Sequence, residues 1–219
     1  MSNIASFLHK VSIYAVPVLL AITFHEAAHG YVAYKKGDPT AYMLGRVTLN
    51  PLRHIDPVGT ILLPLMMLLL GTGMVFGWAK PVPVNFRLLR DQKWDPIYVA
   101  AAGVVTNLGL AALAGILFRL IILFDPGGGV DLTGLPAFIA SMCFVFVRFN
   151  VLLAIFNMIP IPPLDGGRIA VGLLPARASM ALASVERYGM LIVVALFMFG
   201  PLGIIWALVQ WLYLFILGI

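Results

Sequence analysis

The sequence predicts an all-α polytopic membrane protein with about five spanning helices, a re-entrant or hairpin membrane segment and a small membrane-associated β-sheet. Of its 219 residues, 62% are hydrophobic and only 11% are charged, and the mean hydropathy is +1.02. Both values lie outside the range of a soluble globular domain. Apolar runs of about 20 residues, the length that a spanning helix needs, recur between short polar loops.

The first predicted span covers residues 11–34 and is followed by two lysines, Gly37 and Pro39, which end helices. The polar stretch 40–56 contains strand-forming residues between turn signals, so a short sheet or hairpin at the membrane surface is expected there. The proline-rich stretch 81–86 has little helical tendency and is expected to form an extended strand in the same sheet.

The uncharged run 58–78 is long enough to span a membrane but is interrupted by Pro64 and by the closely spaced Gly71 and Gly73. Four Lys or Arg residues lie in the loop before it and four in the loop after it. A single crossing would place these equal groups on opposite sides and erase the positive-inside bias. We therefore expect a re-entrant segment or a helical hairpin, buried against protein.

Four more spans are expected at about 96–124, 136–159, 188–199 with its flanks, and 202–219. The loop after the first of these has no Lys or Arg and is expected outside, whereas three arginines flank a short amphipathic stretch after the second and indicate the cytoplasmic side. The net charge of +5 is accounted for by such loops, and no nucleic-acid-binding motif is present.

His25, Glu26 and His29 place ionisable groups inside the first apolar run. Such groups are costly to bury, so they indicate a function. Residues four apart on a helix share a face, so both imidazoles can bind one metal ion, with Glu26 beside its open position. This H-E-x-x-H arrangement is typical of zinc hydrolases, although a buried polar cluster between helices is the alternative.

A catalytic zinc ion usually takes a third protein ligand. Asp165 follows the span 136–159 at a Pro- and Gly-rich break, and the expected topology brings it out on the same side as the histidines. A turn aspartate is the simpler interpretation of that residue. His54 and Asp56 compete as ligands from the polar surface loop.

These motifs resemble the site-2 protease family of intramembrane zinc metalloproteases, whose signature joins H-E-x-x-H to a later N-x-x-P-x-P-x-L-D-G. The second motif matches in full at residues 157–166, and a third family element, G-x-x-x-N, matches at residues 103–107. The resemblance covers about residues 15–170. It implies one peptidase domain over residues 1–219, with a catalytic core at about 11–170 and a C-terminal helical pair at about 178–219.

The resemblance also implies that His25, His29 and Asp165 bind one Zn²⁺, which polarises the scissile carbonyl. Glu26 would move a proton from water to the leaving amine.

The remaining motif residues would then lie near the substrate, by similarity to the family. Asn107 and Asn157 would donate to a developing oxyanion or hold the substrate backbone, while an interhelical hydrogen bond is the alternative for both. Pro160 and Pro162 lack an N–H donor and would keep their segment extended beside the site.

We therefore expect an intramembrane zinc endopeptidase that hydrolyses peptide bonds in or near transmembrane segments of membrane-protein substrates, in regulated intramembrane proteolysis. We expect it to be a multi-pass protein of the cell membrane, with its active site toward the cytoplasm and the substrate added as a strand to the sheet edge. One alternative is a non-proteolytic metal-binding membrane transporter, which has no evident need for the general base Glu26. A zinc hydrolase that acts on a lipid or a small amide is another alternative.

Overall fold

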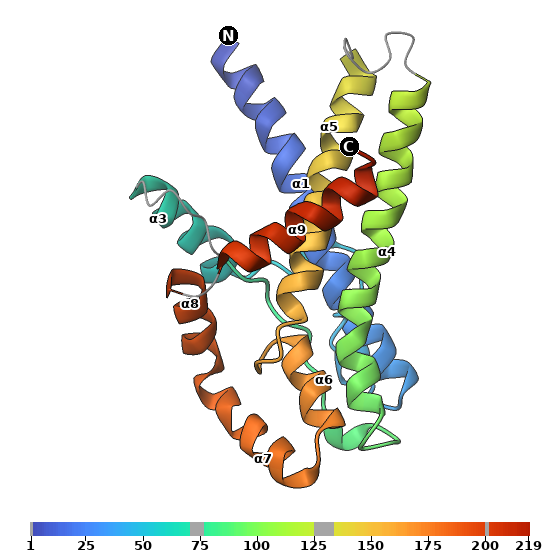
Figure 1. The fold of residues 1–219 in the computed structure, drawn as a ribbon, viewed down its shortest axis with the longest axis vertical. Helices are drawn as coiled ribbons and strands as arrows, with labels where there is room; N and C mark the ends of the chain where they lie inside the picture. The colour runs from blue at the N-terminus through green and yellow to red at the C-terminus, as the bar shows by residue number, and fades with distance from the viewer. Residues whose placement is uncertain (1, 71–76, 125–133, 200–201) are drawn as a thin grey trace.

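Three long helices form the core of the computed structural model, which describes residues 2–70, 77–124, 134–199 and 202–219. They are α1 (Ser2–Lys35), α4 (Asp95–Leu123) and α5 (Gly134–Asn157). In Figure 1, α4 and α5 run side by side in opposite directions, and α1 packs against both of them. The predicted helical core is therefore present, and its helix α1 carries His25 and His29 of the site.

The predicted β-sheet is wrong, because no described residue lies in a strand. The stretch 40–56 instead forms the short helical turns α2 (Thr40–Met43) and η1 (Pro51–Arg53). The side chains of Asp38 and Asn50 each accept a hydrogen bond from the backbone N–H two residues later. Such local bonds favour turns over a strand ladder.

Residues 81–85, here called the extended segment, have no regular secondary structure and pair with no strand. Its two prolines have no N–H to donate to a ladder. The N–H of Val82 donates to Glu26 Oε2 over 2.7 Å. The N–H of Asn85 donates to Asp38 Oδ2 over 2.6 Å. Because carboxylates take these donors, the segment is held against α1 without a partner strand.

The uncharged run 58–78 folds back to where it begins. It starts with η2 (Pro57–Leu62), a π-helix, and α3 (Leu63–Leu69). The backbone N–H of Trp78 donates to the carbonyl oxygen of Gly59 over 3.2 Å, so the two ends of the run lie together. Residues 71–76 of this run lie outside the described residues.

Only two helices of the described part, α4 and α5, are long and apolar enough to span a membrane, so the expectation of about five spans is wrong. The helices α8 (Gly189–Phe199) and α9 (Leu202–Leu217) have 11 and 16 residues. At 1.5 Å per residue they reach about 16 and 24 Å, short of the ~30 Å hydrocarbon core. The sequence expectation extended the span at 188–199 into its flanks and took 202–219 as a full span.

After α5 the chain forms α6 (Asp165–Leu173), α7 (Ala176–Ser184) and η4 (Val185–Tyr188), which follow one another in an arc toward α8. Helix α9 then crosses α4 and α5 obliquely (Figure 1). A buried apolar cluster joins these three helices: Ala111, Ala114, Val147, Val151, Val209 and Leu217. The remaining short turn, η3 (Phe86–Leu88), links the extended segment to α4.

Candidate metal centre

Two helices bring three metal-ligand side chains together. His25 and His29 lie one turn apart on α1, and Asp165 is the first residue of α6. The two Nε2 atoms are 3.0 Å apart. The Asp165 Oδ2 atom lies 3.3 Å from one of them and 3.4 Å from the other. His25 and Asp165 are each only 7% exposed, so the donors converge in the interior.

The outer nitrogen of each imidazole faces an oxygen atom. His29 Nδ1 lies 2.7 Å from the carbonyl oxygen of Val99 on α4. A carbonyl only accepts, so this Nδ1 carries the proton and donates. His25 Nδ1 lies 2.5 Å from Asn107 Oδ1. In the neutral rings, both Nε2 lone pairs therefore point at each other and at Asp165.

This donor set fits a zinc ion. Two lone pairs and a carboxylate oxygen that converge at about 3 Å repel one another unless a cation lies among them. Asp165 Oδ2 is buried and has no hydrogen-bond donor. Tetrahedral ligands at about 2.0–2.1 Å from zinc lie ~3.3–3.5 Å from each other, close to the separations found here. A zinc-bound histidine usually donates its other ring N–H to an oxygen acceptor, as both Nδ1 atoms do here.

Two glycines allow the turn before α6 to bring Asp165 into the site. A Cβ on Gly166 would overlap the carbonyl of Met158, and a Cβ on Gly167 would overlap the backbone of Pro162. Both glycines are buried in the first turn of the helix. The turn at 158–164 therefore packs directly on the helix that carries the carboxylate.

Gly103 leaves room for both histidines on the facing side of α4. A Cβ at this position would lie 2.5 Å from His25 Cε1 and 2.6 Å from His29 Nε2. Real Cβ atoms essentially never come that close. The glycine of G-x-x-x-N thus allows α4 to pack against the imidazoles themselves.

Glu26 is half-buried and follows His25 directly in the chain. Its Oε2 accepts the Val82 N–H of the extended segment. Oε1 accepts no hydrogen bond from the described residues. One oxygen is therefore held in place while the other remains able to accept a proton.

The structure places Asn107 behind His25 and not at a surface that a substrate can reach. Its side chain is fully buried. Its amide nitrogen donates to Asn150 Oδ1 over 2.7 Å and to the Ala21 carbonyl over 3.3 Å. With both N–H groups used, Asn107 has no donor left for an oxyanion.

The other predicted residues of the second motif lie around the turn before α6. The Asn157 amide donates to the Leu153 carbonyl of its own helix over 2.9 Å. Pro160 is exposed and Pro162 is buried.

The two competing ligands do not join the cluster, which among the described residues contains His25, His29 and Asp165. His54 Nε2 lies 2.9 Å from the Thr48 carbonyl. Asp56 accepts hydrogen bonds from the first N–H groups of η2. Both residues therefore act within their own loop.

Sequence reasoning missed three groups around the site: the Asn150 side chain, the Val99 carbonyl and the Val82 N–H. The sequence did carry a signal for Asn150, since an Asn inside an apolar span is costly and indicates a function. The two backbone groups carry no residue-type signal at all. Their roles depend on which segments lie next to α1.

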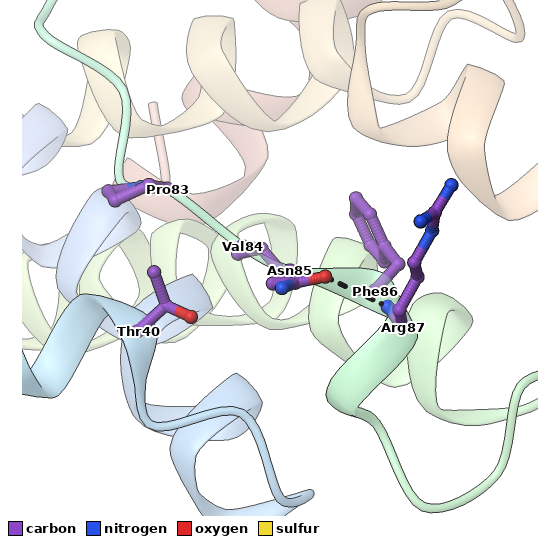
Figure 2. A pocket seen from close by; sticks show the side chains of 6 residues that line it. All are labelled: Thr40, Pro83, Val84, Asn85, Phe86 and Arg87. Atoms are coloured by element: carbon purple, nitrogen blue, oxygen red, sulfur yellow. Dashed lines mark hydrogen bonds between the residues drawn. The ribbon is translucent and has the colours of Figure 1, made fainter.

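A separate pocket of about 440 Å³ lies next to the site, along the extended segment. Figure 2 shows Pro83, Val84, Asn85 and Phe86 following one another along the chain, with Thr40 facing them from α2. The Asn85 side chain accepts a hydrogen bond from the backbone N–H of Arg87 (dashed line in Figure 2). None of the six lining residues belongs to the metal cluster.

Comparison with known proteins decides the family. The family model described as peptidase family M50 matches residues 128–200, which include Asp165. A Bacillus subtilis protein named "Putative zinc metalloprotease YwhC" is 38% identical over 197 residues, which cover 89% of this chain and 84% of that protein. The chain belongs to peptidase family M50, the site-2 protease family. The resemblance found in the motifs is thereby confirmed.

Two mycobacterial relatives of this M50 chain carry the same description with the name Rip2. The Mycolicibacterium smegmatis protein is 34% identical over 81% of this chain and 63% of its own length. The Mycobacterium tuberculosis H37Rv protein is 31% identical over 89% of this chain and 70% of its own length. No solved structure matches the chain significantly.

Family membership and the metal cluster together make this protein a zinc metalloendopeptidase. It is also a membrane protein, with two helices able to cross a bilayer.

Proposed function

We propose that this M50 protease is an intramembrane zinc endopeptidase that hydrolyses peptide bonds in or near transmembrane segments of membrane-protein substrates, in regulated intramembrane proteolysis. The observation that carries the proposal is the cluster of His25, His29 and Asp165, buried beside the two apolar helices α4 and α5. A soluble substrate would not need a site built among such helices. Residues 1–219 form one peptidase domain in this proposal.

His25, His29 and Asp165 hold the zinc ion in this proposal, because their lone pairs converge and their outer atoms are held by other groups. When bound there, zinc supplies a Lewis acid that acidifies water and polarises a carbonyl group. Glu26 is the general base. Its Oε1 takes the proton of the attacking water and delivers it to the leaving amine, while the Val82 N–H holds Oε2.

The active site faces the cytoplasm in this proposal. His29 lies six residues before Lys35, about 9 Å along the helix, so the site is near the charged end of α1. At this end Lys36 pairs with Asp95 over 3.0 Å, and Arg46 donates to the carbonyl of Lys80 over 2.7 Å. Basic loops stay on the cytoplasmic side of a membrane, which supports a multi-pass protein of the cell membrane with this end inside.

Substrate binding by strand addition loses its support, because the extended segment has no sheet edge to offer. A transmembrane peptide would still have to unwind before hydrolysis, since its carbonyls are bonded inside its own helix. The polar loops around the charged end of α1 offer the nearest partners for that unwound backbone.

The test is cleavage by the purified full chain, loaded with zinc in detergent, of a panel of single-span membrane proteins. Mass spectrometry of the products locates each cut. Glu26→Gln should lower cleavage by about 10²- to 10⁴-fold and leave zinc content unchanged, because it removes the general base but no ligand. Glu186→Gln is the matched control, since that exposed carboxylate pairs with Arg168 over 3.5 Å, does not belong to the metal cluster and should leave cleavage unchanged.

Equal cleavage by wild type and Glu26→Gln would contradict the peptidase mechanism. Zinc flux across vesicles that survives Glu26→Gln would indicate the transporter. Cleavage of lipids or small amides, but of no single-span protein, would indicate a zinc hydrolase of lipids or small amides.

A further inference from the structure

A chain of buried amide hydrogen bonds leads from α5 to a histidine of the metal centre. Asn150 Nδ2 donates to the Phe146 carbonyl of its own helix over 2.8 Å. Asn150 Oδ1 accepts from Asn107 Nδ2 over 2.7 Å. Asn107 Oδ1 in turn lies 2.5 Å from His25 Nδ1. Three helices, α5, α4 and α1, are thereby joined through side chains.

Each bond in this chain sets the direction of the next. The Phe146 carbonyl only accepts, so the NH₂ group of Asn150 must face it and the oxygen must face Asn107. The NH₂ group of Asn107 then faces Asn150 and the Ala21 carbonyl, which leaves its oxygen toward the imidazole. An amide oxygen only accepts, so His25 Nδ1 carries the proton. The Nε2 lone pair is therefore left for the metal.

We propose that Asn150 is a positioning residue of the metal centre, which acts through Asn107 to fix the tautomer and the ring orientation of His25. The proposal rests on His25 binding a metal ion, and does not depend on the nature of the substrate. His29 needs no such device, because the Val99 carbonyl fixes its tautomer directly.

The burial of the two amides supports this role over a simple packing role. Asn107 and Asn150 are both 0% exposed. A buried amide in an apolar helix is costly, and an apolar residue of similar volume would pack the same helices without that cost. The two amides instead keep the proton of His25 on Nδ1, so that its Nε2 stays unprotonated and can bind a metal ion. Groups that hold a metal-binding histidine typically change metal affinity by about 10- to 100-fold when removed.

The experiment measures metal binding to the full chain in detergent, without any substrate. Zinc affinity is obtained by competition with a chelator, and the visible absorption of the cobalt-substituted protein reports the ligand geometry. Asn150→Leu removes the amide at similar volume. Asn150→Ser is the second variant, because a helical Ser bonds back to the carbonyl four residues earlier, here that of Phe146, and does not need Asn107.

Both variants should weaken zinc binding by about 10- to 100-fold and alter the cobalt spectrum. Val151→Ala is the matched control, since it removes buried volume from the next position of α5 without touching the amides. It should lower the melting temperature and leave zinc affinity and the spectrum unchanged. Asn107→Leu should reproduce the effect of Asn150→Leu, with no further loss in the double variant.

Zinc affinity and a cobalt spectrum unchanged in Asn150→Ser would overturn the inference, as would an equal loss of affinity in Val151→Ala. A wild-type chain that does not bind zinc would instead contradict the proposed function. The two failures are therefore distinguishable.

Discussion

The two histidines of the metal centre are held in different ways. The Nδ1 of His29 meets a backbone carbonyl, which no substitution removes, whereas the Nδ1 of His25 meets the side chain of Asn107. The first histidine of H-E-x-x-H is thus the one whose geometry depends on other side chains. Both imidazoles also depend on the absence of a side chain at Gly103.

Gly103→Ala should weaken zinc binding about tenfold or more, because its Cβ would displace both imidazoles and such overpacking costs about 1–3 kcal/mol. Chelator competition measures the affinity. Gly109→Ala is the matched control on the same helix, since a Cβ there meets nothing within 4 Å. The control should bind zinc normally and be slightly more stable. Equal zinc affinity in the two variants would show that α4 can move away from the histidines.

At the scale of elements, the extended segment contacts Glu26, the proposed general base, through its backbone. The backbone N–H of Val82 donates to Glu26 Oε2 over 2.7 Å. Its two prolines keep the backbone extended, so that this N–H points at α1. A segment without regular secondary structure therefore makes this contact, in the stretch where the sequence predicted a strand.

Val82→Pro should lower kcat about 10-fold or more and leave zinc affinity unchanged, because it removes the N–H donor to a charged acceptor, a bond of about 1.5–3 kcal/mol. Val82→Ala keeps the donor and controls for the lost side chain. Val84→Pro controls for an additional proline in the same segment. If Val84→Pro lowers kcat as much as Val82→Pro, segment stiffness and not the Glu26 contact explains the loss.

Helix α8, which lies within the stretch that the M50 family model matches, touches the turn that precedes Asp165. A Cβ on Gly189, the first residue of α8, would overlap the Pro162 carbonyl and the Pro163 ring. The apolar helices α4 and α5 each carry an arginine, whose charge is costly to place there. Helix α9 supplies a partner for both arginines. Arg119 donates to the Phe215 carbonyl. The Arg148 guanidinium lies 6.0 Å from the Tyr213 ring centroid.

Gly189→Ala should lower both the melting temperature and the zinc affinity, because the turn at Pro162 packs on the helix that carries Asp165. Gly203→Ala, near the start of α9, is the matched control, since a Cβ there meets nothing within 4 Å. A thermal melt and a chelator titration of the two variants make the comparison. Normal zinc binding by a destabilised Gly189→Ala would limit the role of α8 to global stability.

At the scale of the whole molecule, α4 and α5 form an antiparallel pair whose ends meet the charged loops on one side (Figure 1). The loops before α4 and after α5 therefore share a side. The ends of the uncharged run 58–78 also lie together, so this run adds no change of side. The metal cluster, between α1 and the start of α6, is on the side of these loops.

Single cysteines placed at Arg53, Lys93 and Arg177 in a Cys143→Ala background should react with a membrane-impermeant maleimide only from the cytoplasmic face. All three positions are exposed. A cysteine at Phe124, which is exposed at the far end of α4, should react only from the opposite face. Labelling of Arg53 and Arg177 positions from different faces would contradict the proposed topology.

The sequence by itself was enough to identify the residues of the candidate metal cluster. H-E-x-x-H places two imidazoles on one helical face because helix periodicity is a local property. The Pro- and Gly-rich break at Asp165 indicated the third ligand position, and the family was recognisable from these residues alone. The three long helices were also predictable, since long apolar runs are a local signal.

Only the tertiary structure decided which groups meet across helices. It placed Asn107 and Asn150 behind His25, and the Val82 N–H on Glu26. It also removed the expected sheet, because carboxylates from α1 and its following loop took the donors that a partner strand would have needed. These outcomes depend on contacts between residues far apart in the chain, for which one-dimensional patterns carry no signal.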